Sequence, residues 1–372
     1  MNLVFTCGGT GGHINPAIAV AKMFRERQPD CNILFIGADD GMERDLVPRE
    51  GFRLETLKIS NFQRKLTPVG IWHNIVTAKD ITGSLRKAKK LLREFGADVV
   101  IGTGGYASFP ALSQGAKLGI PTLVHESNAI PGLATRMVAD KVDRIMVSFE
   151  ACRNAYDHPE KVVVTGTPVR EEFLYQTKAA AREKLGLDDT PLVVSCWGSL
   201  GAREMNKNIA DFMVLAAKDG TFRHIHATGS YGWRWMPDFV REKGLDLTKT
   251  PLIDMREYIY DMPTVMAAAD LVICRAGAAT ISEVTVSGTP AIIVPSPNVV
   301  GHHQEKNAQV LGDCGAALVM QENDCTGASL FAAARELLQA PERQQEMRKH
   351  LAEIAVVDAT ERIYANIMEL AR

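Results

Sequence analysis

NLVFTCGGTGGH, residues 2–13, combines an apolar run typical of a β-strand with four glycines in five residues and then a histidine. A helix-compatible run follows from Pro16 to Phe24. Glycine allows a tight turn and a close approach of the backbone to a ligand. A helix that starts here points unpaired N–H groups and the positive end of its dipole at that ligand. The stretch predicts a strand, an anion-binding loop and a helix, with His13 as a titratable ring; a tight turn without a ligand is the plainer alternative.

The same alternation of short apolar runs and longer amphipathic runs continues along the chain. The predicted strands lie at 2–7, 32–36, 98–101, 121–124, 144–147, 161–164, 191–196, 223–227, 271–274, 291–294 and 316–319. Predicted helices include 16–27 and 84–95, and 327–372 is mostly helical. This alternation indicates an α/β fold with βαβ units and parallel sheets.

The two halves of the chain resemble each other. Residues 98–105 (DVVIGTGG) parallel 270–277 (DLVICRAG), and two further pairs of strand-and-loop segments recur in the same order. We therefore predict two doubly wound domains, 1–167 and 168–349, with a helix at about 350–372 that packs back on the first. Ligands bind beyond the carboxyl ends of the strands of such sheets, so facing edges would form one cleft.

Composition excludes several classes of protein. The 372 residues carry a formal net charge of −2, which argues against general nucleic-acid binding. Seven cysteines, none in a CxxC pair, predict buried thiols in a reducing compartment rather than disulfides or a zinc site. No signal peptide is recognisable, and no run reaches the roughly 18 apolar residues that span a bilayer. We expect a cytoplasmic protein, soluble or peripheral at a membrane.

The glycine loop does not match the known nucleotide fingerprints. In the register of GxGxxG, the third glycine is replaced by Ile14, and GxxxxGK[ST] is absent. An NAD-dependent oxidoreductase is therefore the least favoured reading. The better-equipped loop is 275–283, in which Arg275 and small residues open a helix and Glu283 follows. This pattern favours binding of a nucleotide diphosphate, with the carboxylate of Glu283 accepting hydrogen bonds from a ribose. The plainer interpretation is that Glu283 is an acidic residue favoured near a helix N-terminus by the helix dipole.

Further polar residues follow predicted strands or lie at the domain boundary. Ser199, in 197–203, can offer its hydroxyl in a second glycine turn, and Arg170 lies at the boundary, where a surface arginine is the plainer reading. Residues 125–128 follow a buried strand, where polar side chains usually face a ligand. Adjacent His302 and His303 do not share a helix face, so we predict polar ligand contact or a helix start rather than a zinc site.

Two segments bear on membrane contact. Residues 84–95 form a basic helix with an apolar face at Leu85, Ala88, Leu92 and Phe95, most simply an ordinary solvated helix of an α/β protein. Residues 62–76 mix aromatic, aliphatic and basic side chains, a composition that suits an anionic bilayer surface.

Seven motifs in one order resemble the MurG family, the UDP-N-acetylglucosamine-dependent N-acetylglucosaminyltransferases of peptidoglycan synthesis. The motifs are GGTGGH with Pro16, 102–108 (GTGGYAS), 125–128 (HESN), 166–170 (GTPVR), 198–202 (GSLGA), 275–283 (RAGAATISE) and 302–308 (HHQEKNA). The resemblance covers essentially the whole chain and implies the GT-B fold, two facing Rossmann-like domains. Phe109, Cys196-Trp197 and His303 depart from the family's usual residues.

The resemblance also implies the roles of individual residues. The second domain would hold UDP-N-acetylglucosamine, with the uracil at the backbone of Ile259 and the sugar hydroxyls at Gln304. The implied donor-binding residues are Arg170, Ser199, Ile259, Arg275, Ala278, Ala279, Thr280, Ile281, Ser282, Glu283 and Gln304. From the first domain, which would face the acceptor and the membrane, Thr10, Gly11, Gly12 and Asn128 would meet the sugar and the acceptor.

The implied reaction inverts the anomeric carbon as the 4-hydroxyl of the muramoyl sugar of lipid I displaces UDP, which gives lipid II. His13 is one candidate for the general base, because imidazole titrates near neutral pH, and Glu126 is the other. Asn128 is expected beside them in the catalytic site. Alternatively, His13 only orients the donor. No cofactor or obligatory metal is expected. The resemblance further implies a peripheral place on the cytoplasmic face of the plasma membrane, other cell-wall synthesis proteins as partners, and links to cell shape, cell division and the cell cycle.

Three other functions remain open at this stage. The first is another GT-B glycosyltransferase that uses a UDP-sugar and a different lipid or small-molecule acceptor. The second is a nucleotide-sugar epimerase of similar two-domain build, and the third is a non-catalytic scaffold at the membrane. Acceptor-dependent transfer separates the first two from the expected reaction, and intact Arg275, Glu283 and His13 disfavour the scaffold.

Overall fold

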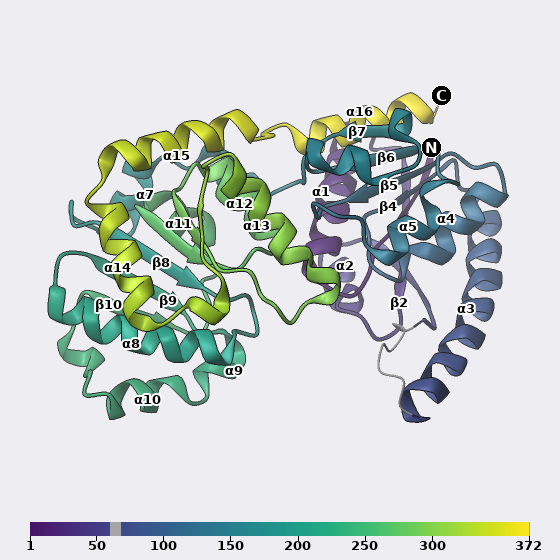
Figure 1. The fold of residues 1–372 in the computed structure, drawn as a ribbon. Helices are drawn as coiled ribbons and strands as arrows, with labels where there is room; N and C mark the ends of the chain where they lie inside the picture. The colour runs from purple at the N-terminus through teal and green to yellow at the C-terminus, as the bar shows by residue number, and fades with distance from the viewer. Residues whose placement is uncertain (60–67, 372) are drawn as a thin grey trace. The chain divides into compact units, whose positions relative to one another are not determined.

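The computed structural model describes residues 1–59 and 68–371, without the side chains of 68–76, 78, 79 and 300. The chain divides into two compact units: the first is Met1–Val169 with Val356–Arg372, and the second is Arg170–Ala355 (Figure 1). This division lies two residues from the expected boundary. The segment expected as one helix at about 350–372 is two helices, α15 (Pro341–Ile354) in the second unit and α16 (Ala359–Leu370) in the first.

The first unit is built on a seven-stranded parallel sheet of order β3-β2-β1-β4-β5-β6-β7. The strands are β1 (Asn2–Thr6), β2 (Asn32–Ala38), β3 (Arg53–Leu57), β4 (Val99–Gly102), β5 (Thr122–Glu126), β6 (Arg144–Val147) and β7 (Val162–Val164). The helices are α1 (Gly11–Arg27), α2 (Glu43–Arg49), α3 (Pro68–Phe95), α4 (Ser108–Lys117), α5 (Leu133–Ala139), α16, and the 3-10 helices η1 (Glu150–Ala155) and η2 (Pro159–Lys161).

Two hydrophobic cores lie on opposite faces of this sheet, because successive strand residues point to opposite sides. One core joins Val4 and Val100 to Ala88 and Leu92 of α3 and to residues of α4 and α5. The other core joins Leu3 and neighbouring strand residues to α1 and α16. The sheet is thus covered by helices on both sides, as the doubly wound prediction requires.

The second unit repeats this plan with a six-stranded parallel sheet of order β10-β9-β8-β11-β12-β13. The strands are β8 (Leu192–Cys196), β9 (Arg223–Ala227), β10 (Ile253–Arg256), β11 (Leu271–Cys274), β12 (Ala291–Ile293) and β13 (Leu318–Val319). The helices are α6 (Glu172–Tyr175), α7 (Lys178–Lys184), α8 (Arg203–Asp219), α9 (Gly229–Trp233), α10 (Met236–Glu242), α11 (Met262–Ala268), α12 (Ala278–Ser287), α13 (His303–Asp313), α14 (Gly327–Leu338), α15, and the 3-10 helices η3 (Leu247–Lys249), η4 (Val300–His302) and η5 (Glu322–Asp324). The α/β, GT-B fold class is confirmed.

Two strands, β3 and β10, escaped the sequence-based prediction. Each lies at the edge of its sheet. Polar residues interrupt the apolar ones in both, as in Ile253-Asp254-Met255-Arg256, and only Ile253 of β10 is buried. An edge strand packs on fewer neighbours, so it lacks the continuous apolar run by which the central parallel strands are recognised.

Helix α16 packs on the first unit beside α1 (Figure 1). The rings of Phe24 and Tyr364 lie 4.5 Å apart between centroids, and Arg27 forms an ion pair with Glu361. Ile363 and Ile367 are buried in the core on that face. None of the described helices is long and apolar enough to cross a membrane.

Candidate functional site

The loop after β1 leads directly into α1, which begins at Gly11 rather than near Pro16. Thr10 is the N-cap, with extended backbone angles (φ −136°, ψ 157°). Proline is favoured in the first turn of a helix, which made Pro16 look like the start; here it stands inside the helix. The first turn therefore consists of Gly11, Gly12 and His13. The N–H of His13 donates to the carbonyl oxygen of Thr10 at 3.0 Å, whereas helix geometry gives the N–H groups of Gly11 and Gly12 no partner one turn earlier in the helix.

A second glycine loop, after β4, contacts the first one through backbone atoms. A Cβ built on Gly105 would lie 2.1 Å from the carbonyl oxygen of Gly8, and Gly105 has a φ of +79°. A Cβ on Gly104 (φ +94°) would lie 2.7 Å from Nδ1 of His13. Both positions need glycine because a side chain there would collide and strain the backbone. The glycines of 102–108 thus serve loop-to-loop packing at the carboxyl edge of the sheet.

His13 is oriented by the loop after β4. Its Nδ1 lies 3.2 Å from the carbonyl oxygen of Thr103, and the Thr103 hydroxyl donates to the carbonyl oxygen of His13 at 2.6 Å. A carbonyl oxygen only accepts hydrogen bonds, so Nδ1 carries the proton when the ring is neutral. This tautomer, assigned from the hydrogen-bond geometry, places the lone pair on Nε2, as a proton acceptor requires.

Glu126, the other candidate base, is buried and fully engaged. Oε1 accepts hydrogen bonds from the backbone and side-chain nitrogens of Asn128 at 3.1 and 2.9 Å. Oε2 accepts from the N–H of Gly132 at 2.9 Å and from the hydroxyl of Thr135 at 2.7 Å. Glu126 is only 2% exposed and accepts four hydrogen bonds. Its carboxylate therefore fixes the loop after β5 and holds Asn128 in place.

In the second unit, α12 starts directly after Gly277, whose extended backbone (φ −65°, ψ 142°) caps the helix. Ala278, Ala279 and Thr280 form its first turn, so their N–H groups are available to an anion in front of the helix. Buried Asn307, from α13, donates from Nδ2 to the carbonyl oxygen of Ala276 at 3.0 Å. Asn307 therefore fixes the loop that presents this turn, a role that the motif alone did not reveal.

Arg275 already has an internal anionic partner. Its Nη1 lies 2.6 Å from Oε2 of Glu322 and 3.2 Å from the carbonyl oxygen of Val294. The guanidinium stands over the ring of Trp197 at 5.6 Å from the centroid. The side chains of Arg275 and Glu322 are only 11% and 16% exposed, so the pair is held firmly. A bound diphosphate would share this cation with Glu322. Glu322 belongs to none of the sequence motifs, so the sequence did not reveal it.

Glu283 lies on α12, and burial of its carboxyl raises its pKa to about 7. The positive charge of Arg170 acts in the opposite direction, which places Arg170 near Glu283; α6, which follows Arg170, packs on α12. Two residues predicted from separate motifs are thus brought together. At neutral pH this carboxyl takes up or releases a proton easily, which makes it a functional-site candidate.

The remaining predicted donor residues lie after β8, after β10, on α12 and on α13. Ser199 is exposed in the turn after β8, and Ile259 is buried in the loop after β10. Gln304, in the first turn of α13, accepts a hydrogen bond from the N–H of Ser296 at its Oε1, 2.9 Å away, which leaves its amide N–H groups as the donors. Ile281 and Ser282 are buried within α12, so they support the helix from inside.

The turn after β8 is held, like the glycine loop of the first unit, by close backbone contact between glycines of two loops. A Cβ on Gly201 (φ +81°) would lie 2.1 Å from the carbonyl oxygen of Thr228. A Cβ on Gly229 (φ +73°) would lie 2.1 Å from the nitrogen of Gly201. Each unit therefore presents its predicted residues at the carboxyl edge of its own sheet. Within the described residues, no group of three or more His, Cys, Asp or Glu side chains could hold a metal ion.

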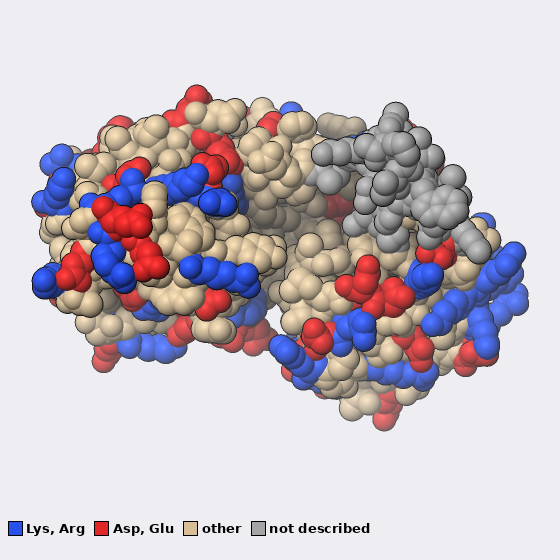
Figure 2. All heavy atoms as spheres, turned by 90° about the horizontal axis from the view of Figure 1, so that it is seen from below, with Lys and Arg blue, Asp and Glu red and all other residues tan. Residues whose placement is uncertain are grey.

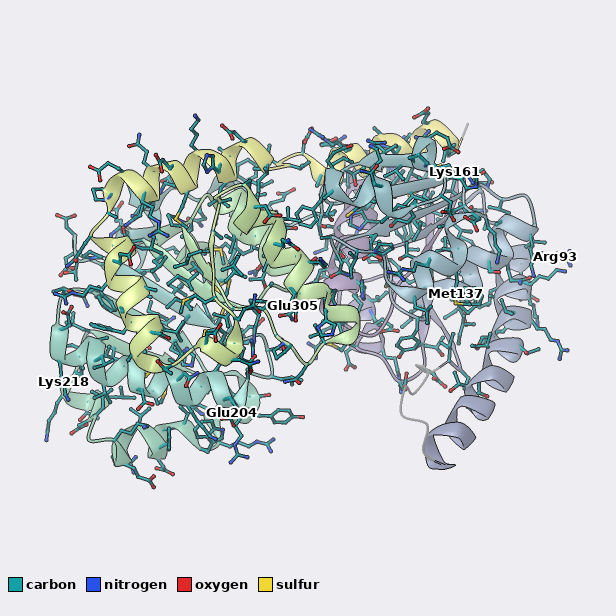
Figure 3. The ribbon with its side chains drawn as sticks, viewed as in Figure 1. Arg93, Met137, Lys161, Glu204, Lys218 and Glu305 are labelled. Atoms are coloured by element: carbon teal, nitrogen blue, oxygen red, sulfur yellow. The ribbon has the colours of Figure 1, made fainter. Side chains whose placement is uncertain are left out.

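The basic helix predicted at 84–95 is the second half of α3. Ala88 and Leu92 are fully buried against the sheet, so much of its apolar face is core rather than membrane surface. Its basic side chains are exposed: Arg86, Lys87, Lys89, Lys90 and Arg93. Lysine and arginine gather along this outer border of the first unit (Figure 2), and Arg93 points away from the sheet (Figure 3). The other predicted segment lies outside the described residues at 62–67 and, for its side chains, at 68–76.

Comparison with known proteins gives consistent matches over the whole chain. Residues 3–147 match the model of the glycosyltransferase family 28 N-terminal domain, and residues 192–363 match that of the C-terminal domain. The chain is 40% identical over 373 residues to the UDP-N-acetylglucosamine–N-acetylmuramyl-(pentapeptide) pyrophosphoryl-undecaprenol N-acetylglucosamine transferase of Acetivibrio thermocellus, covering 100% of this chain and 99% of that protein. It is 41% identical over 371 residues to the protein of that name from Thermoanaerobacter sp. strain X514, with 100% of both covered.

A solved structure agrees with these relatives. The crystal structure of Acinetobacter baumannii MurG superposes with a TM-score of 0.77 at 27% identity, covering 99% of each chain. A UDP-N-acetylglucosamine 2-epimerase assigned as putative in Listeria monocytogenes matches with a TM-score of 0.67 at 14% identity, which shows a shared fold alone.

Proposed function

This chain belongs to glycosyltransferase family 28, and we propose that it transfers N-acetylglucosamine from UDP-N-acetylglucosamine to lipid I, the undecaprenyl-pyrophosphoryl-linked muramoyl pentapeptide, to make lipid II. The observation that carries the proposal is full-length identity of about 40% to transferases named for this donor and this acceptor. The structure supports it with two doubly wound units, each of which presents polar residues at the carboxyl edge of its sheet.

The second unit would hold the donor. The N–H groups at the start of α12 face the diphosphate, and Arg275 neutralises part of its charge while it remains paired with Glu322. Ser199 adds a hydroxyl, the backbone of Ile259 meets the uracil, and Glu283 accepts hydrogen bonds from the ribose diol. Gln304 donates its amide N–H groups to the sugar hydroxyls.

The first unit would supply the acceptor side and the base. The 4-hydroxyl oxygen of the muramoyl sugar forms a bond to the anomeric carbon, the bond from that carbon to the diphosphate breaks, and a β-1,4 link results. The hydroxyl proton passes to Nε2 of His13, because the contact with Thr103 keeps the other ring nitrogen protonated. Thr10, Gly11, Gly12 and Asn128 meet the reacting sugar and acceptor, and Glu126 acts by holding Asn128.

Charge on the departing UDP would be stabilised without a metal ion. Arg275 and the N-terminus of α12 supply positive potential to the leaving diphosphate, the part that a divalent cation plays elsewhere. We therefore expect transfer to continue at an unchanged rate when a chelator is present, and no cofactor beyond the sugar nucleotide to be needed.

One experiment tests the function and this expectation together. Labelled N-acetylglucosamine is offered as the UDP-sugar to lipid I in phospholipid vesicles, with and without EDTA, and product is measured as labelled lipid II. We expect acceptor-dependent transfer in both arms. Free sugar released without acceptor would favour an epimerase, transfer only to another acceptor would favour a different glycosyltransferase, and loss with EDTA would contradict the metal-free mechanism.

The place of action would be the cytoplasmic face of the plasma membrane, with peripheral attachment. The basic outer face of α3, including Arg86, Lys89 and Arg93, suits anionic lipid headgroups. The same assay compares anionic with neutral vesicles, and faster transfer on anionic vesicles is the expected result. Partnership with other cell-wall synthesis proteins, and roles in cell shape, division and the cell cycle, would follow from supplying lipid II.

Donor affinity should depend on pH through Glu283. The ribose diol donates hydrogen bonds to a carboxylate, so the donor binds the ionised form better, and burial raises the pKa of the free carboxyl to about 7. Affinity is then highest above pH 7 and falls as the pH drops, by about tenfold between pH 8 and pH 6. Calorimetric titration with UDP-N-acetylglucosamine measures this, because its doubly esterified diphosphate has no proton that titrates in this range.

Glu283→Gln, which cannot ionise, serves as the control for that titration. The variant should bind the donor more weakly at pH 8 and show no pH dependence. A flat profile for the unaltered protein, or full donor affinity in Glu283→Ala, would remove Glu283 from the ribose site.

A further inference from the structure

Glu43, the first residue of α2, is a buried carboxylate that belongs to no motif discussed above. The residue is 0% exposed. Its Oε1 accepts a hydrogen bond from the N–H of Ala38 at 2.7 Å, and its Oε2 accepts one from the N–H of Gly9 at 3.2 Å. Within the described part of the chain, its carboxylate has no lysine, arginine or histidine as an ion-pair partner. A buried charge held only by backbone N–H groups calls for an explanation, since burying it is costly.

Three glycines form a space that fits this carboxylate. A Cβ on Gly41 would lie 2.1 Å from Oε2 of Glu43, and one on Gly37 would lie 2.5 Å from its Cγ. A Cβ on Gly8 would lie 2.9 Å from Oε1 and 2.5 Å from the Cβ of Ala107. Gly37 lies in β2 and Gly41 in the connection from β2 to α2, whereas Gly8 comes from the loop after β1. Glu43 thus bridges two separate loops in a space without side chains.

The hydrogen bond to Gly9 has a direct consequence for the loop. Gly9 has a φ of +92° and immediately precedes Thr10, the N-cap of α1. Holding its N–H fixes the peptide plane from which the first turn, Gly11 to His13, departs. On the opposite side, His13 is held by Thr103. The loop between β1 and α1 is therefore held on one side by Glu43 and on the other by the loop after β4.

We propose that Glu43 is a positioning residue for transfer: it holds the glycine loop in the conformation in which its N–H groups and His13 meet the acceptor and the reacting sugar. This inference rests on the proposed role of that loop. It requires a carboxylate rather than a residue of the same shape, because both oxygens must accept from N–H donors and the amide of glutamine offers one acceptor only. Small displacements of a catalytic group lower turnover steeply.

The test compares Glu43→Gln with Glu50→Gln, which alters a half-buried glutamate of the same region that pairs with Lys22. Transfer to lipid I is measured well below the melting temperature of each variant. We expect kcat to fall about 10- to 100-fold in Glu43→Gln with the Kd for UDP-N-acetylglucosamine within twofold, and no change in Glu50→Gln. In a His13→Ala background the further loss from Glu43→Gln should be less than threefold, because both act through the same loop.

A second variant reaches the same carboxylate without altering it. Gly41→Ala places a methyl group against Oε2 in a backbone conformation that alanine adopts, and Gly83→Ala, with open space around it, is its control. Gly41→Ala should reproduce the loss of turnover, and Gly83→Ala should not.

Amide hydrogen exchange at residues 9–13 gives a readout independent of activity, and we expect it to rise in Glu43→Gln and Gly41→Ala. Normal turnover with unchanged exchange, or a full additional loss in the His13→Ala background, would overturn the inference. Failure of the unaltered protein to transfer would instead count against the proposed function, and the exchange data would still decide whether Glu43 holds the loop.

Discussion

His13→Ala is expected to lower kcat for transfer to lipid I by about 10²- to 10⁴-fold, the usual contribution of a general base. The physical reason is that the muramoyl hydroxyl is a weak nucleophile unless its proton is removed during attack. The structure presents the ring in the tautomer that suits this task, with Nδ1 donating to Thr103. Binding of UDP-N-acetylglucosamine should stay within twofold, because the residues proposed to hold its uridine diphosphate belong to the second unit.

The measurement is steady-state transfer to lipid I combined with calorimetric donor titration. His158→Ala is the matched control, because that histidine is exposed and its Nδ1 lies 3.1 Å from Oε1 of the nearby Glu160. It should transfer normally. Near-normal turnover in His13→Ala would remove the ring from the chemistry, and a parallel loss of donor binding would point to donor orientation instead.

Glu126→Gln is expected to destabilise the first unit by about 3–5 kcal/mol, as for other buried charges whose hydrogen-bonded partners are left behind. The amide would place an NH₂ group against two of the four donors that now surround the carboxylate: Asn128, with two donors, Gly132 and Thr135. The melting temperature should fall by about 10 °C for a unit of this size.

Thermal unfolding followed by circular dichroism checks this, with Glu150→Gln as control. Glu150 is exposed and pairs with Arg153 on the surface, where water screens the ion pair and its loss changes stability little. A normally stable Glu126→Gln protein without turnover would instead identify Glu126 as the base.

The parts of the fold and site that could be predicted carry local signals. Continuous apolar runs marked the central strands, and glycine-rich turns with a following helix marked the loops at 8–13 and 275–283. Placing both at carboxyl strand ends needed only the rule for parallel sheets. The family resemblance assigned both Arg170 and Glu283 to the donor, but their proximity to each other was not predicted and emerges from the fold.

The parts that could not be predicted depend on contacts between distant segments. Glu43 begins α2 and Glu322 begins η5, neither of them in a motif. Their partners, Gly9 and Arg275, are 34 and 47 residues away. Similarly, nothing in the sequence shows that the glycines at 104 and 105 pack against His13 and Gly8. A single sequence does not state which loop packs on which, so such positioning residues emerge only from the fold.

The placement of α16 has a consequence for biosynthesis. Residues 170–355 form the second unit without interruption, and the first unit needs residues on both sides of them. During translation the second unit can complete its core while the first still lacks Ile363 and Ile367, which fill the face beside α1. The first unit is thus the last to mature, and a nascent chain stalled before residue 356 would expose the apolar surface that α16 covers.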